Sequence, residues 1–493
     1  MKNKILFLLI LSIAVVAVYG AGSRAPGSSG AAASRDLSLC MSQIRYGYSV
    51  DDKLMRSWVE PIEKATNTKI EIKALPHNDF FTLLNVQMAS GDYPDIIRPQ
   101  QSWNYVTQFA IRGYLQPLTR FINNDPRFAQ LKGLDLAMYT YNKDIYGIPT
   151  EKGNVKNIWF RKDSIDKYRL NIKDSMTTAE FVTELRKINK SEAIPFTFPR
   201  FIVNFQIFYN FFGAYAGILP DKNGNYYDGF QTNEMKEALR WVKSLYDEGL
   251  MDSQFITNEN SHMREKFASG RAASDIDYTQ RYSYYVQTAN DVGAPTDFVP
   301  VYTLVGPRGN SGNLNESGNE AMCLSVRNPN VEASMDIINW LFFTQEGRIH
   351  DAIGVEGVHY NITNRLLVPT QAAASTGYSI EHQRFSNSWA EVPFSRLGFS
   401  FQGLSDDTVN TMLKYVAIAL EPRYKGPLIR IPMGMSPIYD ENVATYNANL
   451  DEMATKIVLG TQTVDAAYAD YARFWNSIRG DEMLRQINAA MKK

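Results

Sequence analysis

Hydrophobic residues in the first part of the chain recur with alternating periods, which predicts helices and strands in turn. In residues 51–66 the apolar side chains Leu54, Trp58 and Ile62 keep helical spacing, whereas residues 69–74 alternate as in a strand. The expected elements are a strand at 37–46, a helix at 51–66, a strand at 69–74, a helix at 80–89 that ends at Gly91, and a strand at 95–98. This order is typical of a parallel sheet with crossover helices, in which ligands bind beyond the carboxyl ends of the strands.

A second α/β unit is expected from about residue 155. Its predicted elements are a strand at 159–161, a helix after Asp163, helices at 177–189, 205–216, 234–248 and 258–268, and a strand at 272–277. A strand at 321–326 and a helix at 331–343 follow, and residues 440–493 read as helical with stops at Gly460 and Gly480.

The first residues have the pattern of a signal peptide. Lys2 and Lys4 precede an apolar run at 5–18, and small residues follow at 20–22. The alternative is a membrane anchor, but this run is shorter than the roughly 20 apolar residues that span a bilayer. We therefore expect residues 1–20 to be removed on export, and the Gly-, Ser- and Ala-rich residues 21–36 to form a flexible lead-in.

The segment Leu37–Cys40 imitates the lipobox of bacterial lipoproteins. Bulky Leu39 precedes the cysteine, however, and the site lies far beyond the apolar run. The expected product is therefore an exported periplasmic or extracellular protein that is not evidently a lipoprotein.

Composition narrows the function classes further. The 493 residues include 51 Lys plus Arg against 52 Asp plus Glu, so the chain lacks the basic excess of a nucleic-acid-binding protein. Its 44% hydrophobic and 21% charged residues are typical of a globular protein, and the length suits two or three domains. Two cysteines cannot form a disulfide framework or a multi-thiolate zinc site. The chain is instead rich in aromatic residues, with 28 Tyr, 26 Phe and 7 Trp.

Several motifs, spread in order over most of the chain, resemble one family. They are MASGDYPDII (88–97), GYLQPL (113–118), YGIP (146–149), WFRKDSIDKYRLN (159–171), LRWVKSLYDEGLMDSQF (239–255), FASGRAA (267–273), VGPRG (305–309), INWLFFTQEG (338–347), GVEGVHY (354–360) and KIVLGTQTVDAAYADY (456–471). The chain thereby resembles the extracellular solute-binding proteins of ABC importers, specifically the family 1 group with long chains that bind oligosaccharides.

This resemblance implies a two-lobed α/β periplasmic binding protein fold of type II-like form, with a helical C-terminal part. Each lobe would be a sheet flanked by helices, and the lobes would close on ligand about a hinge. The expected first lobe comprises residues 37–150 and about 290–345. The expected second lobe, with the C-terminal helices, comprises residues 151–289 and about 346–493.

A sugar site pairs flat aromatic rings with amides, carboxylates and arginines, because pyranose rings have apolar faces and a rim of hydroxyls. Residues of these types in segments expected to face the cleft are Gln101, Trp103, Glu151, Asp277, Tyr278, Glu356 and Tyr360. Four of them also have a structural interpretation. Trp103 could be the buried first turn of a helix, Glu151 a solvated loop charge, Asp277 a helix cap and Glu356 part of a tight turn.

Residues 221–229, DKNGNYYDG, offer the oxygen ligands Asp221, Asn223 and Asn225 at the spacing that begins a calcium loop. The segment departs from the EF-hand pattern, because Gly224 comes early and the twelfth position is Thr232 instead of Glu. A hairpin turn around Asn-Gly explains it equally simply and is favoured. Structural calcium is the one metal hypothesis, and no cofactor is required.

Other chemistry lacks a motif in the sequence. The five histidines have no metal-ligand spacing, and the chain contains no GxSxG elbow, Walker A loop or GxGxxG segment after a strand. Cys40 and Cys323 fall in expected strands of the same lobe. Two buried thiols are favoured over a disulfide there, although an oxidising compartment permits one.

The sequence thus predicts a receptor, not an enzyme. It would capture an oligosaccharide in the interlobe cleft, deliver it to the transmembrane subunits of an ABC permease, and act as a monomer. The alternatives are a secreted glycoside hydrolase or lyase, whose carboxyl groups would have to face each other across a scissile bond, and a receptor for a peptide or another small solute.

Overall fold

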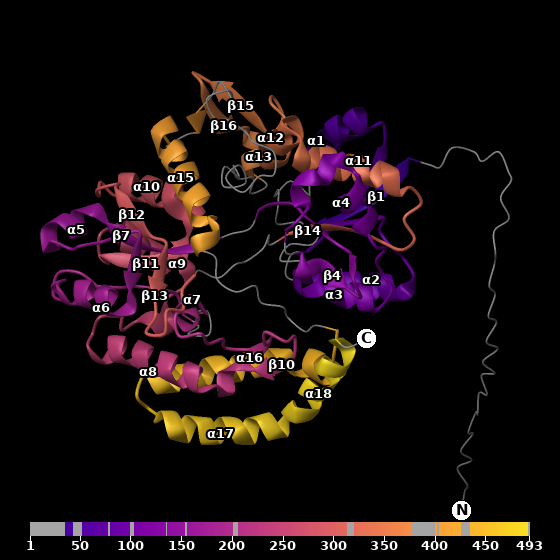
Figure 1. Ribbon diagram of the computed structural model, residues 1–493. Coiled ribbons are helices and arrows are strands. Elements are labelled where there is room, and N and C mark those ends of the chain that lie inside the picture. Colours follow the sequence, from indigo (N-terminus) through magenta and orange to yellow (C-terminus); the bar gives the residue numbers. More distant parts are fainter. Residues whose placement is uncertain are drawn as a thin grey trace, which may run out of the picture.

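The computed structural model describes residues 35–42, 52–76, 79–98, 103–134, 136–152, 155–200, 206–312, 320–375, 400–401, 404–424 and 434–491. These residues form two α/β lobes that lie side by side in Figure 1, with the C-terminal helices beneath the second lobe. The expected two-lobed architecture is confirmed.

The first lobe is built on a sheet with the strand order β2-β1-β3-β14-β6. Strands β1 (Asp36–Ser42), β2 (Lys69–Leu75) and β3 (Ile96–Arg98) are parallel, whereas β14 (Ala321–Leu324) pairs antiparallel with β3 and with β6 (Ile148–Pro149). Its helices are α1 (Asp52–Thr66), α2 (Phe80–Ser90), α3 (Trp103–Ile111), α4 (Thr119–Asn124) and α11 (Val331–Phe343). Short elements complete it: η3 (Pro126–Leu131), η4 (Ala137–Tyr139), β4 (Thr140–Tyr141) and β5 (Asp144–Ile145). The predicted strand–helix alternation of residues 37–98 is confirmed.

The second lobe contains the antiparallel sheet β11-β7-β12 and the parallel pair β13-β8. Its strands are β7 (Lys156–Arg161), β8 (Ser175–Thr177), β9 (Ile218–Pro220), β10 (Tyr226–Asp228), β11 (Ser274–Tyr278), β12 (Phe298–Val301) and β13 (Thr303–Val305). Its α-helices are α5 (Lys162–Tyr168), α6 (Thr178–Arg186), α7 (Gln206–Asn210), α8 (Asn233–Asp247), α9 (Asn260–Ala268) and α10 (Tyr282–Asp291). Three 3₁₀ turns, η6 (Gly229–Gln231), η7 (Phe255–Thr257) and η8 (Thr279–Arg281), lie between them.

A helix expected at 205–216 is much shorter in the structure. Helix α7 ends at Asn210, and a turn follows in which Gly213 has a φ of +72°. Glycine tolerates this left-handed backbone, which ends the helix that the apolar spacing alone would continue.

The described residues of 345–375 and 400–424 join the two lobes along one side of the molecule. Helix α12 (Gln345–Ile353) packs on α11 in the first lobe, and α15 (Asp406–Ala419) packs on α10 in the second. Between them in the chain lie β15 (Tyr360–Thr363), β16 (Leu366–Pro369), α13 (Gln371–Ser375) and β17 (Ser400–Phe401). Figure 1 shows β15, β16 and α13 between the lobes at the top. The 3₁₀ turn η10 (Pro422–Tyr424) follows α15.

The lobe boundaries therefore differ from those expected near residues 290 and 346. Strands β12 and β13 pair within the second lobe, since Phe298 lies opposite Arg161 in the register and Thr303 opposite Ser175. Helix α12 contacts the first lobe, where Asp351 binds Arg98. We propose that the first lobe comprises residues 36–149 and 321–353, and that the second begins at β7.

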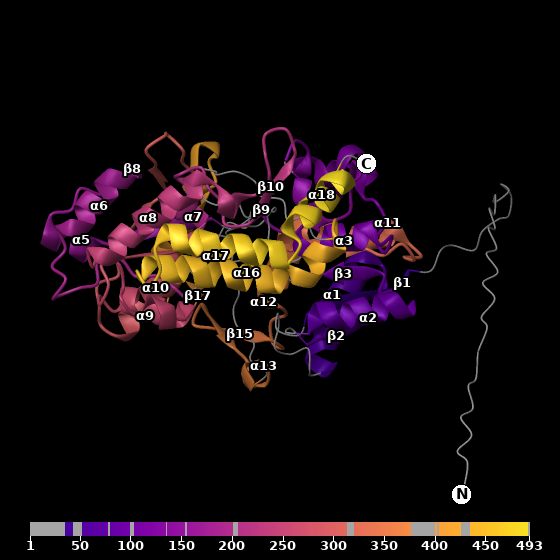
Figure 2. The same cartoon turned by 90° about the horizontal axis from the view of Figure 1, so that it is seen from below.

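The C-terminal part is helical, as predicted, in α16 (Pro437–Val458), α17 (Val464–Ser477) and α18 (Gly480–Met491). The break before α18 falls at Arg479, whose φ is +59°, and not at Gly480, which begins the helix. Viewed from below, α16 and α17 run alongside each other (Figure 2). Tyr446 of α16 and Tyr471 of α17 both donate hydrogen bonds to the buried carboxylate of Asp228, which fastens these helices to the second lobe.

The two cysteines are free and buried, which confirms the favoured interpretation. Cys40 in β1 and Cys323 in β14 both lie opposite Ile97, on either side of β3. Neighbouring strands are about 4.8 Å apart. Two strand spacings exceed the Cα separation that a disulfide permits, so these thiols cannot pair without moving the sheet.

Candidate functional site

The two sheets turn one edge each toward the other lobe. In the first lobe the carboxyl ends of β1, β2, β3 and β6 share an edge, and antiparallel β14 begins there. The chain leaves this edge after Pro149 and enters β7 at Lys156. That end of β7 lies beside the carboxyl end of β11, because Lys156 is opposite Tyr278 in the register. A connection this short makes the two edges face each other, and this arrangement is the candidate site.

An ion network closes the first-lobe edge at the end of β3. Arg98 is fully buried, and its guanidinium donates to both oxygens of Asp351 at 2.7 and 3.0 Å. Glu320, which precedes β14, lies 3.8 Å from Arg98, and Arg348 lies 3.5 Å from Asp351. Both arginines also lie over the ring of Phe342. Two positive and two negative side chains thus balance at this edge. The network connects the end of β3, the residue that precedes β14, and α12.

Two aromatic rings that sequence reasoning missed stand at the same edge. Phe81 lies in the first turn of α2, which follows β2, and Tyr105 lies in the first turn of α3, which follows β3. Both rings are half-buried and stacked, with centroids 3.3 Å apart. Such rings can present a flat apolar surface to a sugar. Their position in the sequence could have identified them, since each lies in the first turn of a helix that follows a strand of the parallel sheet.

The second-lobe edge carries Tyr278 and Lys156. Tyr278 is half-buried, and the ammonium group of Lys156 lies 4.9 Å from the centre of its ring. Thr279 donates its backbone N–H and its hydroxyl to the carbonyl of Val155, at 2.8 and 2.9 Å. These bonds fasten the end of β11 to the start of β7 and fix Tyr278 at the edge, where it was expected.

Asp277 was predicted to contact ligand, but its carboxylate is engaged inside the lobe. It is 3% exposed and accepts hydrogen bonds from Arg264 Nε at 2.6 Å and from the Tyr285 hydroxyl at 3.1 Å. Tyr285 also donates to Asp275, whose other carboxylate oxygen has no partner among the described residues. Burial, and secondarily the charge of Asp277, raise the pKa of Asp275 well above its usual value. This cluster favours a structural role for Asp277.

The other residues predicted to contact ligand lie in different environments or outside the described residues. Gln101 lies outside the described residues, and Trp103 begins α3 but its side chain is likewise outside the described part. Glu151 lies in the crossing between the lobes and is half-buried, so it stays a candidate. Glu356 is exposed in a turn where Gly357, with a φ of +79°, donates its N–H to the carbonyl of Tyr360.

Tyr360 does not fit the predicted stacking role. It is 7% exposed and belongs to a hydrophobic cluster that includes Trp159 and Tyr285 of the second lobe and Ile353 of α12. Burial also raises the pKa of its hydroxyl to about 12. The ring therefore packs in the core that joins the lobes.

The predicted calcium ligands form a turn between β9 and β10. One carboxylate oxygen of Asp221 accepts the backbone N–H groups of Asn223 and Asn225 at 2.8 and 2.9 Å, and Gly224 has a φ of +82°. These bonds, from Asn225 first, hold the pKa of Asp221 below its usual value. Over the described ranges, His, Cys, Asp and Glu side chains nowhere gather in threes as a metal site would need.

A pocket of about 390 Å³ lies elsewhere, at the amino ends of β1 and β2. Its lining includes Ser38, Arg56, Glu63, Lys69 and Asp95. Because these positions are at the end of the sheet opposite Arg98, the pocket is separate from the facing edges.

Two buried histidines fasten residues 350–359 to α1. His350 Nε2 lies 2.8 Å from the carbonyl oxygen of Trp58, and its ring stacks on the Trp58 indole. His359 accepts the N–H of Val355 at Nδ1, so its Nε2, 3.2 Å from the carbonyl of Leu54, carries the proton. Burial lowers the pKa of both rings, that of His350 to about 4.

This predicts a loss of stability in mild acid. The unfolded chain binds a proton at His350 below pH of about 6.5, while the folded state stays neutral down to about 4. Stability is therefore complete above pH 6.5 and falls as the pH is lowered, by about 2 kcal/mol between pH 7 and pH 5. Urea unfolding of wild type and His350→Gln at both values tests this. Between pH 7 and pH 5 the variant should lose distinctly less free energy of unfolding than wild type. Equal losses in wild type and variant would contradict the prediction. His262→Gln, on the exposed surface of α9, is the control.

In the part of the chain that the structure describes, no helix combines the length and the apolar character needed to cross a membrane.

Comparisons with known proteins agree with this architecture. The chain is 25% identical, over 319 residues, to the polygalacturonan/rhamnogalacturonan-binding protein YtcQ of Bacillus subtilis (strain 168), covering 62% of this chain and 63% of that protein's length. It is 20% identical to the lipoprotein LipO of the same organism, over 97% of both chains. Among solved structures, the sugar-binding protein MalE of Xanthomonas citri superposes with a TM-score of 0.63 at 14% identity, covering 93% of this chain and 99% of that one.

The family comparison spans both lobes. Residues 49–347 match the family described as bacterial extracellular solute-binding protein, and the match runs from the start of α1 to α12. Since it covers more than half of the 493 residues, the chain belongs to the bacterial extracellular solute-binding proteins.

Proposed function

We propose that the protein is the receptor of an ABC importer and binds an oligosaccharide between its two lobes without cleaving it. The observation that carries this proposal is the pair of facing sheet edges, each of which bears half-buried aromatic rings beside polar groups. Phe81 and Tyr105 stand on one side and Tyr278 on the other, with Glu151 in the crossing between them. Rings placed in this way suit the apolar faces of sugars, and the carboxylate suits their hydroxyls.

Binding without turnover is the testable form of the proposal. Isothermal calorimetry against a broad panel of plant and algal oligosaccharides should find a ligand with a Kd of about 1 μM or lower. Chromatography of the same mixture after long incubation should return the oligosaccharide intact. Cleavage products would favour a hydrolase or lyase, and tight binding of a peptide with no binding of any glycan would contradict the proposal.

The family supports two accompanying proposals, namely that the receptor acts outside the cytoplasmic membrane and that it delivers its ligand to the transmembrane subunits of a permease. We also propose that it acts as a monomer. We favour release by signal cleavage over a lipid anchor, because Leu39 precedes Cys40 and because Cys40 lies in the interior strand β1, 0% exposed. Mass spectrometry of the exported protein decides between a cleaved and a lipid-modified N-terminus.

The turn at residues 221–225 should not need calcium. Its Asp221 carboxylate is already used by two backbone amides, and the Asp221 N–H donates to the Asn225 carbonyl at 2.8 Å, as in an ordinary hairpin turn. A chelator is therefore expected to leave the Tm unchanged, because a metal stabilises only when it binds the native state. Thermal unfolding with excess EDTA, then with added calcium, checks this. A fall in Tm that calcium reverses, and that Asp221→Ala abolishes, would establish a metal site instead.

A further inference from the structure

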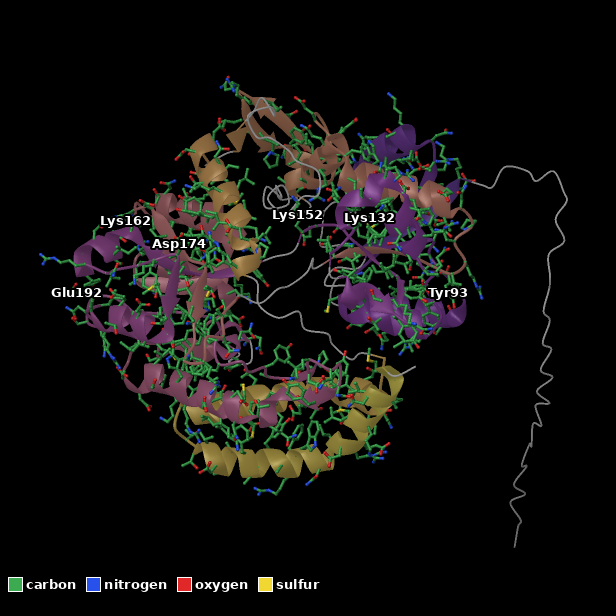
Figure 3. All side chains as sticks on the ribbon, in the orientation of Figure 1. Tyr93, Lys132, Lys152, Lys162, Asp174 and Glu192 are labelled. Atoms are coloured by element: carbon green, nitrogen blue, oxygen red, sulfur yellow. The ribbon has the colours of Figure 1, made fainter. Side chains whose placement is uncertain are left out.

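The second-lobe edge holds positive side chains that are not matched by carboxylates. Lys156 is half-buried at the start of β7, Arg281 is half-buried at the end of η8, and Lys152 is exposed in the crossing. Among the described residues, none of the three makes an ion pair. Figure 3 shows Lys152 in the space between the two lobes.

The register brings Lys156 and Arg281 to the same end of the sheet. Lys156 is opposite Tyr278, and the bonds of Thr279 to Val155 bind the two chain segments together directly beyond that pair. Arg281 follows two residues later in the same short turn. Of the nearby carboxylates, Asp277 is neutralised by Arg264, which leaves Glu151 as the opposing charge in the crossing.

The first-lobe edge does not cancel this charge. Arg98 and Arg348 balance Asp351 and Glu320 there, and all four side chains are nearly or fully buried. Counted over the residues that the structure describes, the two edges therefore carry a positive excess, and Lys156 already lies over the aromatic ring of Tyr278.

If the proposed function holds, on which this inference rests, the charge determines the class of sugar. We propose that Lys152, Lys156 and Arg281 form a carboxylate-binding lip, and that the ligand is an oligosaccharide of uronic acids. A uronate residue has a flat C–H face that can lie on Tyr278 and a carboxylate that Lys156 or Arg281 can bind by charge-assisted hydrogen bonds. A neutral oligosaccharide would leave these cations with water alone.

Matched pairs of ligands test the charge directly. Hexamers of galacturonate, glucuronate, mannuronate and guluronate are each compared, by calorimetry in low salt, with the same oligosaccharide after reduction of its carboxyl groups to alcohols. Linkage and ring geometry are then equal within each pair, and only the charge differs. At least one acidic hexamer should bind tenfold or more tightly than its reduced form, and its affinity should fall as salt is raised from roughly 20 to 300 mM.

Variants locate the effect. Lys156→Gln/Arg281→Gln should weaken the acidic hexamer about tenfold, a change of about 1.4 kcal/mol, and should leave the reduced hexamer within about twofold. Lys162→Gln is the matched control, because Lys162 directly follows the other end of β7, pairs with Asp166, and lies at the far side of the lobe in Figure 3. It should bind both hexamers like wild type.

The outcomes separate the two proposals. If a reduced or natural neutral oligosaccharide binds as tightly as every acidic one, or if the double variant weakens both members of a pair equally, the lip is not a carboxylate site, while the proposed receptor function stands. If no oligosaccharide of either kind binds, the proposed function itself fails.

Discussion

Asp351→Ala is expected to lower the free energy of unfolding by about 3–5 kcal/mol, because it leaves a buried positive charge without its carboxylate partner. The Arg98 and Asp351 side chains are both 0% exposed and share two hydrogen bonds. Without the Asp351 carboxylate, the buried guanidinium groups of Arg98 and Arg348 would have only Glu320, 3.8 Å from Arg98, as an opposing charge in this network. Urea denaturation at pH 7.5 measures the change as a shift in the midpoint at unchanged slope.

An exposed pair provides the control for this prediction. Glu237 binds Arg308 at 2.6 Å, but their side chains are 46% and 43% exposed, so Glu237→Ala should cost no more than about 1 kcal/mol. The double variant Arg98→Met/Asp351→Leu should regain part of the stability that Asp351→Ala loses, since it removes both charges together. A cost for Asp351→Ala as small as that for Glu237→Ala would mean that water reaches this pair.

The second large effect is expected from two tyrosines that should respond in opposite ways. Tyr360→Ala should lower the free energy of unfolding by about 3–5 kcal/mol, because the ring is 7% exposed in the cluster with Trp159 and Ile353. The protein that stays folded should bind its oligosaccharide nearly as wild type does. Tyr278→Ala should do the reverse, with a five- to hundredfold loss of affinity, about 1–3 kcal/mol, and a small change in stability.

The measurement is therefore paired: the Tm and the affinity for the tightest hexamer, for each variant. Tyr285→Phe serves as a reference for the interior of the second lobe, since it removes the hydroxyl that lies within hydrogen-bond distance of Asp275 and Asp277 and leaves the ring in place. If Tyr360→Ala kept its Tm and lost affinity, the ring would be a ligand contact, as the sequence suggested. If Tyr278→Ala had a lower Tm but the affinity of wild type for the oligosaccharide, the candidate site would be in the wrong place.

Local patterns were sufficient for much of the fold. Residues 37–98 alternate between two hydrophobic periods, and each period reports burial on one face of a strand or helix. The parallel strands β1, β2 and β3 and the helices between them follow directly, as does the rule that ligand meets their carboxyl ends. The buried cysteines were predicted for the same reason, since both fall in expected strands of one lobe.

Pairings between distant residues were beyond the reach of such patterns. Strand β12 joins β7 in the second lobe and α12 joins the first lobe, because hydrogen bonds and ion pairs form between segments that are far apart in the sequence, which periodicity cannot connect. The boundaries expected from the sequence put β12 with the first lobe and α12 with the second, which differs from the lobes that we propose. It also placed a helix stop at Gly480, where the structure uses the left-handed backbone of Arg479.

The sequence by itself determined the family, the two-lobed architecture and the kinds of residue that a sugar site uses. Only the tertiary structure decided which of them can meet a ligand. Tyr278 and Tyr360 are the same residue type, yet one lies half-buried at a sheet edge and the other is enclosed by residues from both lobes. The Asp277 carboxylate is bonded to Arg264 and Tyr285 inside the lobe and is therefore not free to bind a ligand. Lys156 lies beside Tyr278 because the two strands pair in antiparallel register. Exposure and charge balance are set by neighbours from distant parts of the chain, and those neighbours exist only once the lobes have folded.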